Sequence, residues 1–131
     1  MRRSPDGTPN EEHCELLRFV YQDFERLADT ATDDIILHTA DRALVPDGIR
    51  RGLATVLAHE RGLLEATAGT LVMDVRQVIA DDHFGAVMGI LRATKPARIA
   101  MPFCGLWRFA EGKLAEHWEN AYAASELGGL F

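Results

Sequence analysis

Two carboxylates, a histidine and a tryptophan lie within five residues near the end of the chain, in the segment Glu116–Asn120. Side chains alternate between the faces of a strand, so His117 and Glu119 share one face while Glu116 and Trp118 share the other. A single β-bulge would invert this assignment. A carboxylate buried in an apolar pocket has a raised pKa and can act as a general base. Such a base could remove a proton next to a carbonyl group and promote ring closure or a double-bond shift.

The length and composition of the chain limit the classes of protein to which it can belong. The 131 residues suit one domain with a single core, and the net charge of −6 argues against a nucleic-acid partner. No apolar run is long enough to cross a membrane, and the charged N-terminus lacks a signal peptide, so we expect a cytoplasmic protein without a membrane partner. The two cysteines lack the spacing of a zinc site, and the sequence predicts neither a metal nor a cofactor.

The pattern along the chain predicts helices first and strands afterwards, which is an α+β plan. Residues 1–10 contain two prolines and a glycine and are predicted to form a mobile tail, so the single domain spans residues 11–131. Apolar residues at steps of three and four predict helices after Glu11 and over residues 53–66. We expect a short strand over 33–41, strands over 70–80 and 84–94, a loop over 95–102, and a closing hairpin of strands 103–110 and 113–122.

The order of these elements and the stretch "LWRFAEGKLAEHWEN" resemble the SnoaL-like (polyketide cyclase-like) proteins of the nuclear transport factor two and ketosteroid isomerase-like superfamily. The resemblance covers roughly residues 11–125. It implies a curved antiparallel sheet that forms a cone around the N-terminal helices and encloses an apolar pocket. Members of the superfamily commonly pair through the outer face of the sheet, so the resemblance also implies a homodimer.

The resemblance indicates which of the two carboxylates in Glu116–Asn120 is the candidate catalytic residue. In the cyclases, an acidic residue six positions after the lysine of the Gly-Lys turn is the catalytic acid/base, and that position is Glu119 here. The partner histidine of the cyclases lies eight positions before the same lysine, where this chain has Gly105. The pair is therefore incomplete, and His117 is the predicted substitute because histidine is readily poised near neutral pH.

Other polar residues are weaker candidates for the same pocket. His38 ends a strand that borders the pocket mouth in this superfamily, and we include it among the catalytic candidates. Asp74 and Arg92 lie in otherwise apolar strands. They are either polar groups of the pocket or a solvent-facing ion pair of little energetic weight.

The pocket lining is predicted from the same register. Trp107 and Phe109 share the parity of Gly105, and Tyr21, Met73 and Met88 are further candidates. Aromatic and methionine walls suit a flat, hydrophobic ligand, although ordinary core packing explains each residue equally well.

Two functions remain open at this point. The first is a cofactor-independent proton-transfer enzyme, a cyclase or isomerase or a related epoxide hydrolase, that acts on a small hydrophobic carbonyl-bearing or polyketide-like molecule of secondary metabolism. The second is a non-catalytic module that binds a small molecule or dimerises. The incomplete pair at Gly105 favours the second.

Overall fold

The computed structural model of the chain describes residues 8–122. Its first helix, α1 (Glu11–Gln22), begins where the sequence predicts it because Asn10 caps the helix. The Asn10 side chain accepts a hydrogen bond of 3.0 Å from the His13 backbone N–H, a donor with no partner inside the helix. Residues 1–7 of the predicted tail and residues 123–131 of the predicted domain lie outside the described residues.

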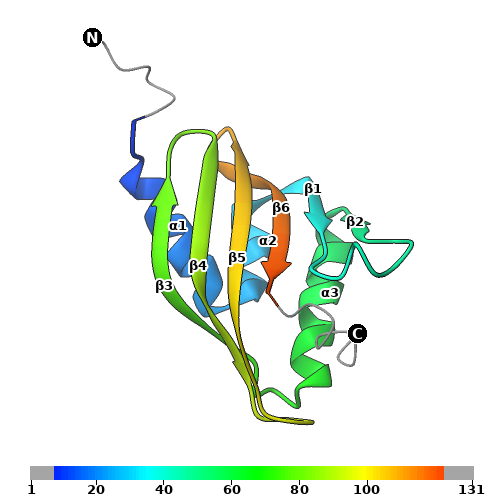
Figure 1. Cartoon of the computed structure of the whole chain (residues 1–131). Coiled ribbons are helices and arrows are strands. Elements are labelled where there is room, and N and C mark those ends of the chain that lie inside the picture. Colours follow the sequence, from blue (N-terminus) through cyan, green and yellow to red (C-terminus); the bar gives the residue numbers. More distant parts are fainter. Residues whose placement is uncertain (1–7, 123–131) are drawn as a thin grey trace.

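The remaining elements follow α1 in an α+β order, as predicted. They are η2 (Phe24–Arg26), α2 (Leu27–Thr30), β1 (Ala31–His38), β2 (Ile49–Arg51), α3 (Leu53–Ala66), β3 (Val72–Ala80), β4 (Phe84–Ala93), β5 (Ile99–Ala110) and β6 (Lys113–Ala121) (Figure 1). Among residues 8–122, no helix is long and apolar enough to cross a membrane.

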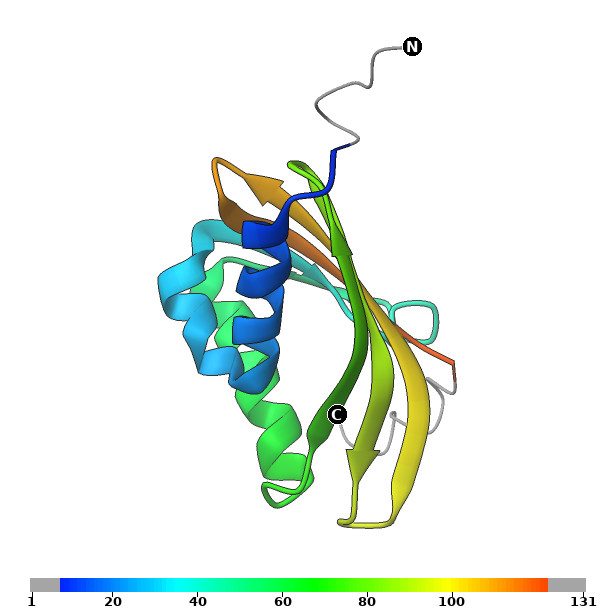
Figure 2. The ribbon, with the colours of Figure 1, turned by 90° about the vertical axis from the view of Figure 1, so that its left-hand side faces the viewer.

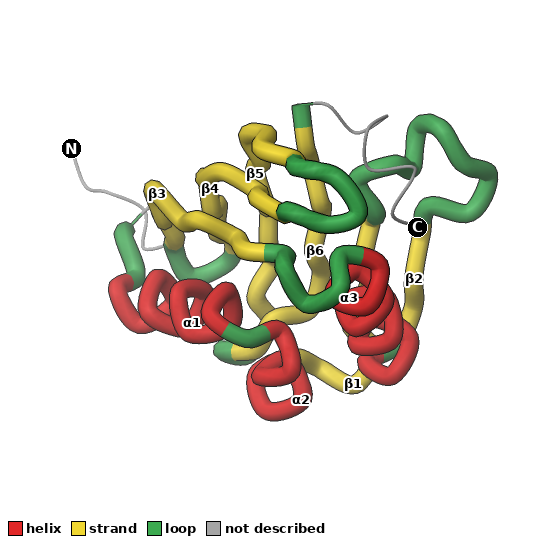
Figure 3. The backbone as a smooth tube through the Cα atoms, turned by 90° about the horizontal axis from the view of Figure 1, so that it is seen from below, coloured by secondary structure: helices red, strands yellow, loops and turns green. Residues whose placement is uncertain are grey.

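The strands form one curved, open sheet in the order β2-β1-β6-β5-β4-β3. All neighbours are antiparallel except β1 and β6, which run parallel, so the sheet is mixed, whereas a purely antiparallel sheet was expected. The helices lie against the concave face (Figure 2), and seen from below they stand side by side along it (Figure 3). The core lies between these layers and includes the fully buried Leu17, Val56 and Val87.

A β-bulge sets the register of β6 against β5. Phe109 pairs with Leu114 and Arg108 pairs with Glu116, which leaves Ala115 as the extra residue. Leu114 and Ala115 are therefore both buried, although strict alternation placed Leu114 on the outer face. Because the bulge precedes Glu116, the alternation predicted for the residues that follow holds.

The start of β5 differs from the prediction. Pro102 lies within the segment 95–102 that was expected to be a loop, yet β5 begins at Ile99. The last pair between β5 and β6 is Phe103 with Ala121, so Pro102 lies where this pairing ends, and its carbonyl oxygen accepts a hydrogen bond of 3.1 Å from the Tyr122 N–H. A proline without an N–H is tolerated at such an edge position.

Candidate functional site

A small chamber lies between α3 and the concave face of the sheet. Its volume is about 50 Å³, room for only a few water-sized groups, since one water needs about 10–15 Å³. A larger cleft of about 520 Å³ adjoins it. Five residues line both spaces and separate them: Tyr21, Phe24, Glu60, Leu71 and Met73. The remaining walls of the chamber are mainly apolar, and the polar groups are gathered on α3 and β6.

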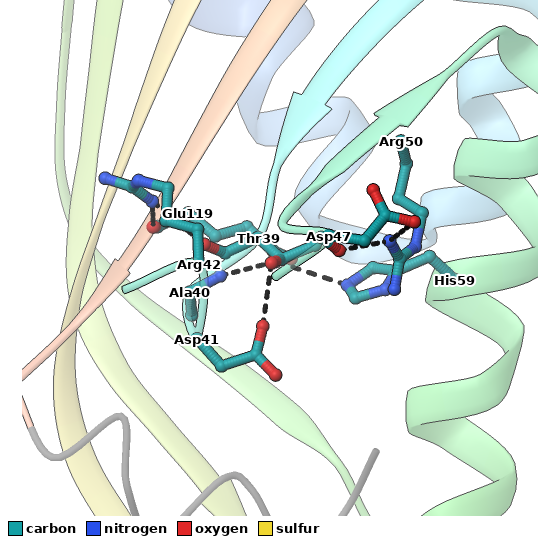
Figure 4. A network of polar contacts seen from close by, with 8 residues as sticks. All are labelled: Thr39, Ala40, Asp41, Arg42, Asp47, Arg50, His59 and Glu119. Atoms are coloured by element: carbon teal, nitrogen blue, oxygen red, sulfur yellow. Dashed lines mark hydrogen bonds and ion pairs between the residues drawn. The ribbon is translucent and has the colours of Figure 1, made fainter. Parts of the chain in front are cut away.

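Glu119 of β6 lines this chamber, as predicted from strand parity. Its Oε1 atom lies 3.2 Å from the Nε2 atom of His59 on α3 and accepts a hydrogen bond of 3.2 Å from the backbone N–H of Ala40 (Figure 4). The His59 side chain is only 5% exposed and the Glu119 side chain 16%. The carboxylate is thus held by two donors that come from distant parts of the chain.

The loop after β1 holds the Ala40 N–H in place. Arg42 donates hydrogen bonds to the backbone oxygens of Thr39 and Glu119 and to the Oδ1 atom of Asn120, so its guanidinium ties the loop to the end of β6. Gly48 permits this arrangement because a Cβ atom there would overlap the backbone and Cβ of Arg42. The position of Glu119 therefore depends on a loop with no predicted role.

The electrostatic surroundings keep Glu119 ionised. Burial raises the pKa of its carboxyl group, but the hydrogen bond and charge of His59, together with the Ala40 N–H, outweigh burial and lower that pKa below its usual value. Glu119 is consequently a carboxylate at neutral pH and a comparatively weak base.

Glu60, one residue after His59, is a second carboxyl group at the chamber. It is only 6% exposed, and its Oε1 atom is buried without a hydrogen-bond partner among residues 8–122. Burial first, and then the negative charge of Glu119, raise the pKa of Glu60 well above its usual value. One carboxyl group of the chamber therefore carries a proton under conditions where the other does not.

His59, Glu60 and Glu119 also form the one group of potential metal ligands within residues 8–122. One ligand atom from each residue lies within 4.8 Å of those from the other two. The sequence-based expectation of no metal did not consider this group, because neither His59 nor Glu60 was among the candidate residues.

His117 lies on the chamber wall as predicted, but its surroundings disfavour a charged state. It is 3% exposed and stacks on Trp107 with 3.5 Å between ring centroids. Burial lowers the pKa of His117 to about 3, so the ring is neutral near pH 7. A neutral imidazole can form a hydrogen bond with a ligand but does not supply a positive charge there.

Tyr21 occupies the space next to Gly105, where the cyclases carry their histidine. A Cβ atom on Gly105 would overlap the Tyr21 hydroxyl and would lie 3.2 Å from the Nε2 atom of His117. The Tyr21 hydroxyl accepts a hydrogen bond of 3.0 Å from the indole N–H of Trp107. The position that the resemblance assigns to a histidine is thus filled by a tyrosine from α1.

The structure places His38 on the opposite face of the sheet, away from the chamber. Its Nε2 atom lies 2.7 Å from Glu116, which also accepts a hydrogen bond from Arg108, and its ring stacks on Trp118. The neighbouring residues Ile35 and Leu37 are fully buried on the inner face, so alternation directs His38 outward. The predicted role of His38 at the pocket mouth is not supported by this position.

Three predicted ligand contacts also lie away from the chamber. Asp74 and Arg92 join Arg76 in an exposed ion-pair group, with distances of 3.4 Å from Arg92 and 2.8 Å from Arg76 to Asp74. Met88 is partly buried, and its strand neighbours Val87 and Gly89 lie on the core side, so Met88 belongs to the outer face. Of the two alternatives for Asp74 and Arg92, the structure shows the solvent-facing ion pair.

The predicted apolar lining is divided between chamber and core. Tyr21 and Met73 line the chamber. Trp107 is buried behind it, where it contacts His117 and Tyr21. Phe109 packs at the far end of the sheet and stacks on His13 with 3.9 Å between ring centroids. Sharing a face with Gly105 was therefore not sufficient to bring a side chain to the chamber.

His59 and Glu60 were missed by the sequence analysis, although α3 carries a signal for Glu60. The apolar stripe of this helix includes Val56, Leu57 and Leu63, and Glu60 occupies the position between them that faces the core. An acid within an apolar stripe is costly unless it is functional or paired. No comparable signal marks Ala40, which contributes only a backbone N–H.

Comparison with known proteins agrees with this architecture. The SnoaL-like domain profile matches residues 11–117. Bal32a from a soil-derived mobile gene cassette is 20% identical with a TM-score of 0.77, covering 88% of this chain and 92% of that one. A candidate SnoaL-like polyketide cyclase from Jannaschia sp. CCS1 is 14% identical with a TM-score of 0.77, over 99% and 96% of the chains.

An NTF2-like protein of unknown function from Cytophaga hutchinsonii ATCC 33406 is 17% identical with a TM-score of 0.67, over 85% and 96% of the chains. These identities support the fold alone. No protein of curated function matches the sequence. The helices packed on a curved sheet and the match over residues 11–117 lead to one assignment: the chain belongs to the SnoaL-like domain family, with the NTF2-like fold.

Proposed function

We propose that this protein is a proton-transfer enzyme, a cyclase or isomerase, that acts on a small hydrophobic carbonyl-bearing molecule. The observation that carries the proposal is the Glu119 carboxylate, held by His59 and Ala40 at the wall of a mainly apolar chamber. The similarity to a candidate polyketide cyclase supports a polyketide-like substrate.

Glu119 is the proposed base, and its lowered pKa limits the protons that it can remove. A weak carboxylate base suits a carbon flanked by two carbonyl groups, where the proton is unusually acidic. After proton transfer, the His59 N–H stays within hydrogen-bond reach of the protonated Glu119, which can return the proton to a second carbon. Return of the proton to a second carbon gives a double-bond shift. In ring closure the carbanion instead forms a C–C bond with an internal carbonyl carbon, and the oxygen of that carbonyl takes the displaced electron pair and accepts the proton from Glu119.

Glu60 suits a complementary role on the substrate oxygen. Its protonated carboxyl group can donate a hydrogen bond to a carbonyl oxygen, where negative charge develops as Glu119 removes the proton. Glu60 lines both the chamber and the outer cleft, whereas Glu119 lines only the chamber, so the carbonyl end of a substrate held in the cleft would have to enter the chamber to contact both carboxyl groups. In this proposal, Glu119 as base and Glu60 as acid act together at one polar end of the pocket.

Exchange of substrate hydrogens for solvent deuterium tests the proposal and does not require the reaction product to be identified. Aryl ketones and β-keto esters would be incubated with protein in D2O and followed by proton NMR. We expect Glu119→Gln to lower the exchange rate by about 10²- to 10⁴-fold, the usual contribution of a general base. Glu116→Gln is the matched control, since Glu116 lies on the same strand but the opposite face. Equal rates in wild type and Glu119→Gln would refute the proposal.

A non-catalytic binding module is the second candidate. The small chamber volume and the replacement of the cyclase histidine by the Gly105–Tyr21 contact favour it. In that case the ketones would bind, as measured by calorimetry, without accelerated deuterium exchange, and Glu119→Gln would leave their affinity almost unchanged.

A further inference from the structure

Three side chains converge beside the chamber, and together they have a composition typical of metal ligands. His59 contributes an imidazole nitrogen, and Glu60 and Glu119 contribute carboxylate oxygens, all within 4.8 Å of one another. The pair already in contact, His59 Nε2 and Glu119 Oε1, is separated by 3.2 Å. Ligand atoms around a zinc ion lie about 3–3.5 Å apart, given bonds of about 2.0–2.2 Å. The Glu60 oxygen, which lies within 4.8 Å of the other two ligand atoms, would complete such a set by moving to this closer spacing.

The burial of Glu60 is the second observation. Its side chain occupies a core position of α3, and its Oε1 atom has no hydrogen-bond partner within residues 8–122. Two carboxyl groups in an apolar chamber repel each other when both are ionised, and a cation between them removes that repulsion. The neighbouring Arg42 does not serve this purpose, because its hydrogen bonds go to Thr39, Asn120 and the Glu119 backbone.

We propose that His59, Glu60 and Glu119 bind a divalent first-row metal ion such as zinc. A mixed set of one imidazole and two carboxylates suits such ions, and three protein ligands leave at least one coordination position open toward the chamber. The ion takes the place of the proton in the His59–Glu119 hydrogen bond, so metal binding releases protons.

This site does not depend on the proposed proton-transfer function, and the two make opposite demands on Glu119. A carboxylate that coordinates zinc is not available to accept a substrate proton. Zinc is therefore expected to slow the deuterium exchange catalysed by the metal-free protein. Binding itself is measurable on the resting protein, so the failure of one proposal is separable from the failure of the other.

The test uses the full chain without an affinity tag, freed of metal with a chelator. Titration with zinc is followed by calorimetry, and titration with cobalt(II) by visible absorption, which reports a low-coordinate site directly. We expect one ion per chain. Loss of an outer-shell partner commonly costs about 10- to 100-fold in affinity, and His59→Gln and Glu60→Gln should each cost at least as much.

His38→Gln is the matched control. His38 and Arg108 both contact Glu116, and the His38–Glu116 distance is 2.7 Å. Because Arg108 is a cation, this group of three residues is not expected to bind a metal ion. Circular dichroism verifies that each variant is folded. The proposal is overturned if neither ion binds, or if His59→Gln and Glu60→Gln bind as tightly as wild type. It is equally overturned if His38→Gln loses as much affinity as they do.

Discussion

The hydroxyl group of Tyr21 occupies the space that a side chain at position 105 would need. Tyr21 comes from α1 and Gly105 from the middle of β5, so the contact joins the helical layer to the sheet at the chamber wall. The tyrosine hydroxyl also accepts a hydrogen bond from the indole N–H of Trp107. This arrangement makes glycine the residue that fits at 105 and gives Tyr21 a structural reason for its position.

Gly105→Ala is therefore expected to destabilise the protein by about 1–3 kcal/mol, the usual cost of overpacking a core. Chemical denaturation measures the change. In Gly105→Ala/Tyr21→Phe the added methyl group no longer meets a hydroxyl, so the double variant should lose less stability than the sum of the single variants. Additive losses would show that the two residues do not compete for the same space.

Glu60→Leu is expected to stabilise the fold by about 1–3 kcal/mol at pH 8, because it removes a buried polar group without a partner and completes the apolar stripe of α3. The raised pKa of Glu60 gives the sign of the pH dependence. Its contribution to stability is greatest below its unfolded pKa and is lost as pH rises through its folded pKa. The advantage of the leucine variant should thus grow between pH 5 and pH 8. A variant less stable than wild type at pH 8 would contradict this interpretation.

His117→Phe should make the protein more resistant to acid. The pKa of His117 is about 3 in the folded protein and about 6.5 when unfolded, so the unfolded state binds the proton first as pH falls. Stability is lost between pH 6.5 and about 3, by an amount on the order of 5 kcal/mol. Phenylalanine keeps a flat ring against Trp107 but does not titrate. Urea denaturation at pH 7 and pH 4.5 should show a smaller decrease for the variant; an equal decrease would argue that His117 is already protonated or exposed.

The outer face of the sheet supports the expectation of a homodimer, which remains a prediction. Phe84 and Leu106 are 57% and 43% exposed there, and they contribute to the same surface depressions. Burial of such side chains in a dimer is favourable. Sedimentation should give twice the 14.5 kDa chain mass, and Leu106→Glu should give a monomer.

Leu44→Glu is the control for that experiment, because Leu44 is 61% exposed but lies in the loop between β1 and β2. A wild-type protein that sediments as a monomer would contradict the prediction of a homodimer. So would a Leu106→Glu variant that remains dimeric.

The sequence predicts most elements because their signals are local. The stripe of α1 and the turn at Glu111-Gly112, where both residues have positive φ, are examples. The face of His38 was not predictable, since Ile35, Ile36 and Leu37 form a continuous apolar run without alternation. The start of β5 was missed because Pro102 reads as a loop signal.

The candidate site was predicted only where it depends on β6. Parity placed Glu119 and His117 at the chamber because the bulge at Ala115 precedes them. His59 and Ala40 reach Glu119 from 60 and 79 residues away, and such contacts depend on the packing of α3 and the loop after β1. Local patterns carry no information about that packing, although the acid within the α3 stripe could have identified Glu60.

The parallel pairing of β6 with β1 affects how the chain can fold during translation. β6 is the last strand described, yet it lies between β1 and β5 near the middle of the sheet. While the ribosome still holds β6, β1 and β5 have no strand between them. Part of the apolar surface of the helices then has no sheet to pack against. β1 and β5 cannot join one sheet until Lys113–Ala121 leaves the exit tunnel, so the earlier segments must avoid aggregation in the meantime. Ribosome-stalled chains in which Lys113–Ala121 is absent or still inside the exit tunnel should therefore be the ones that chaperones capture.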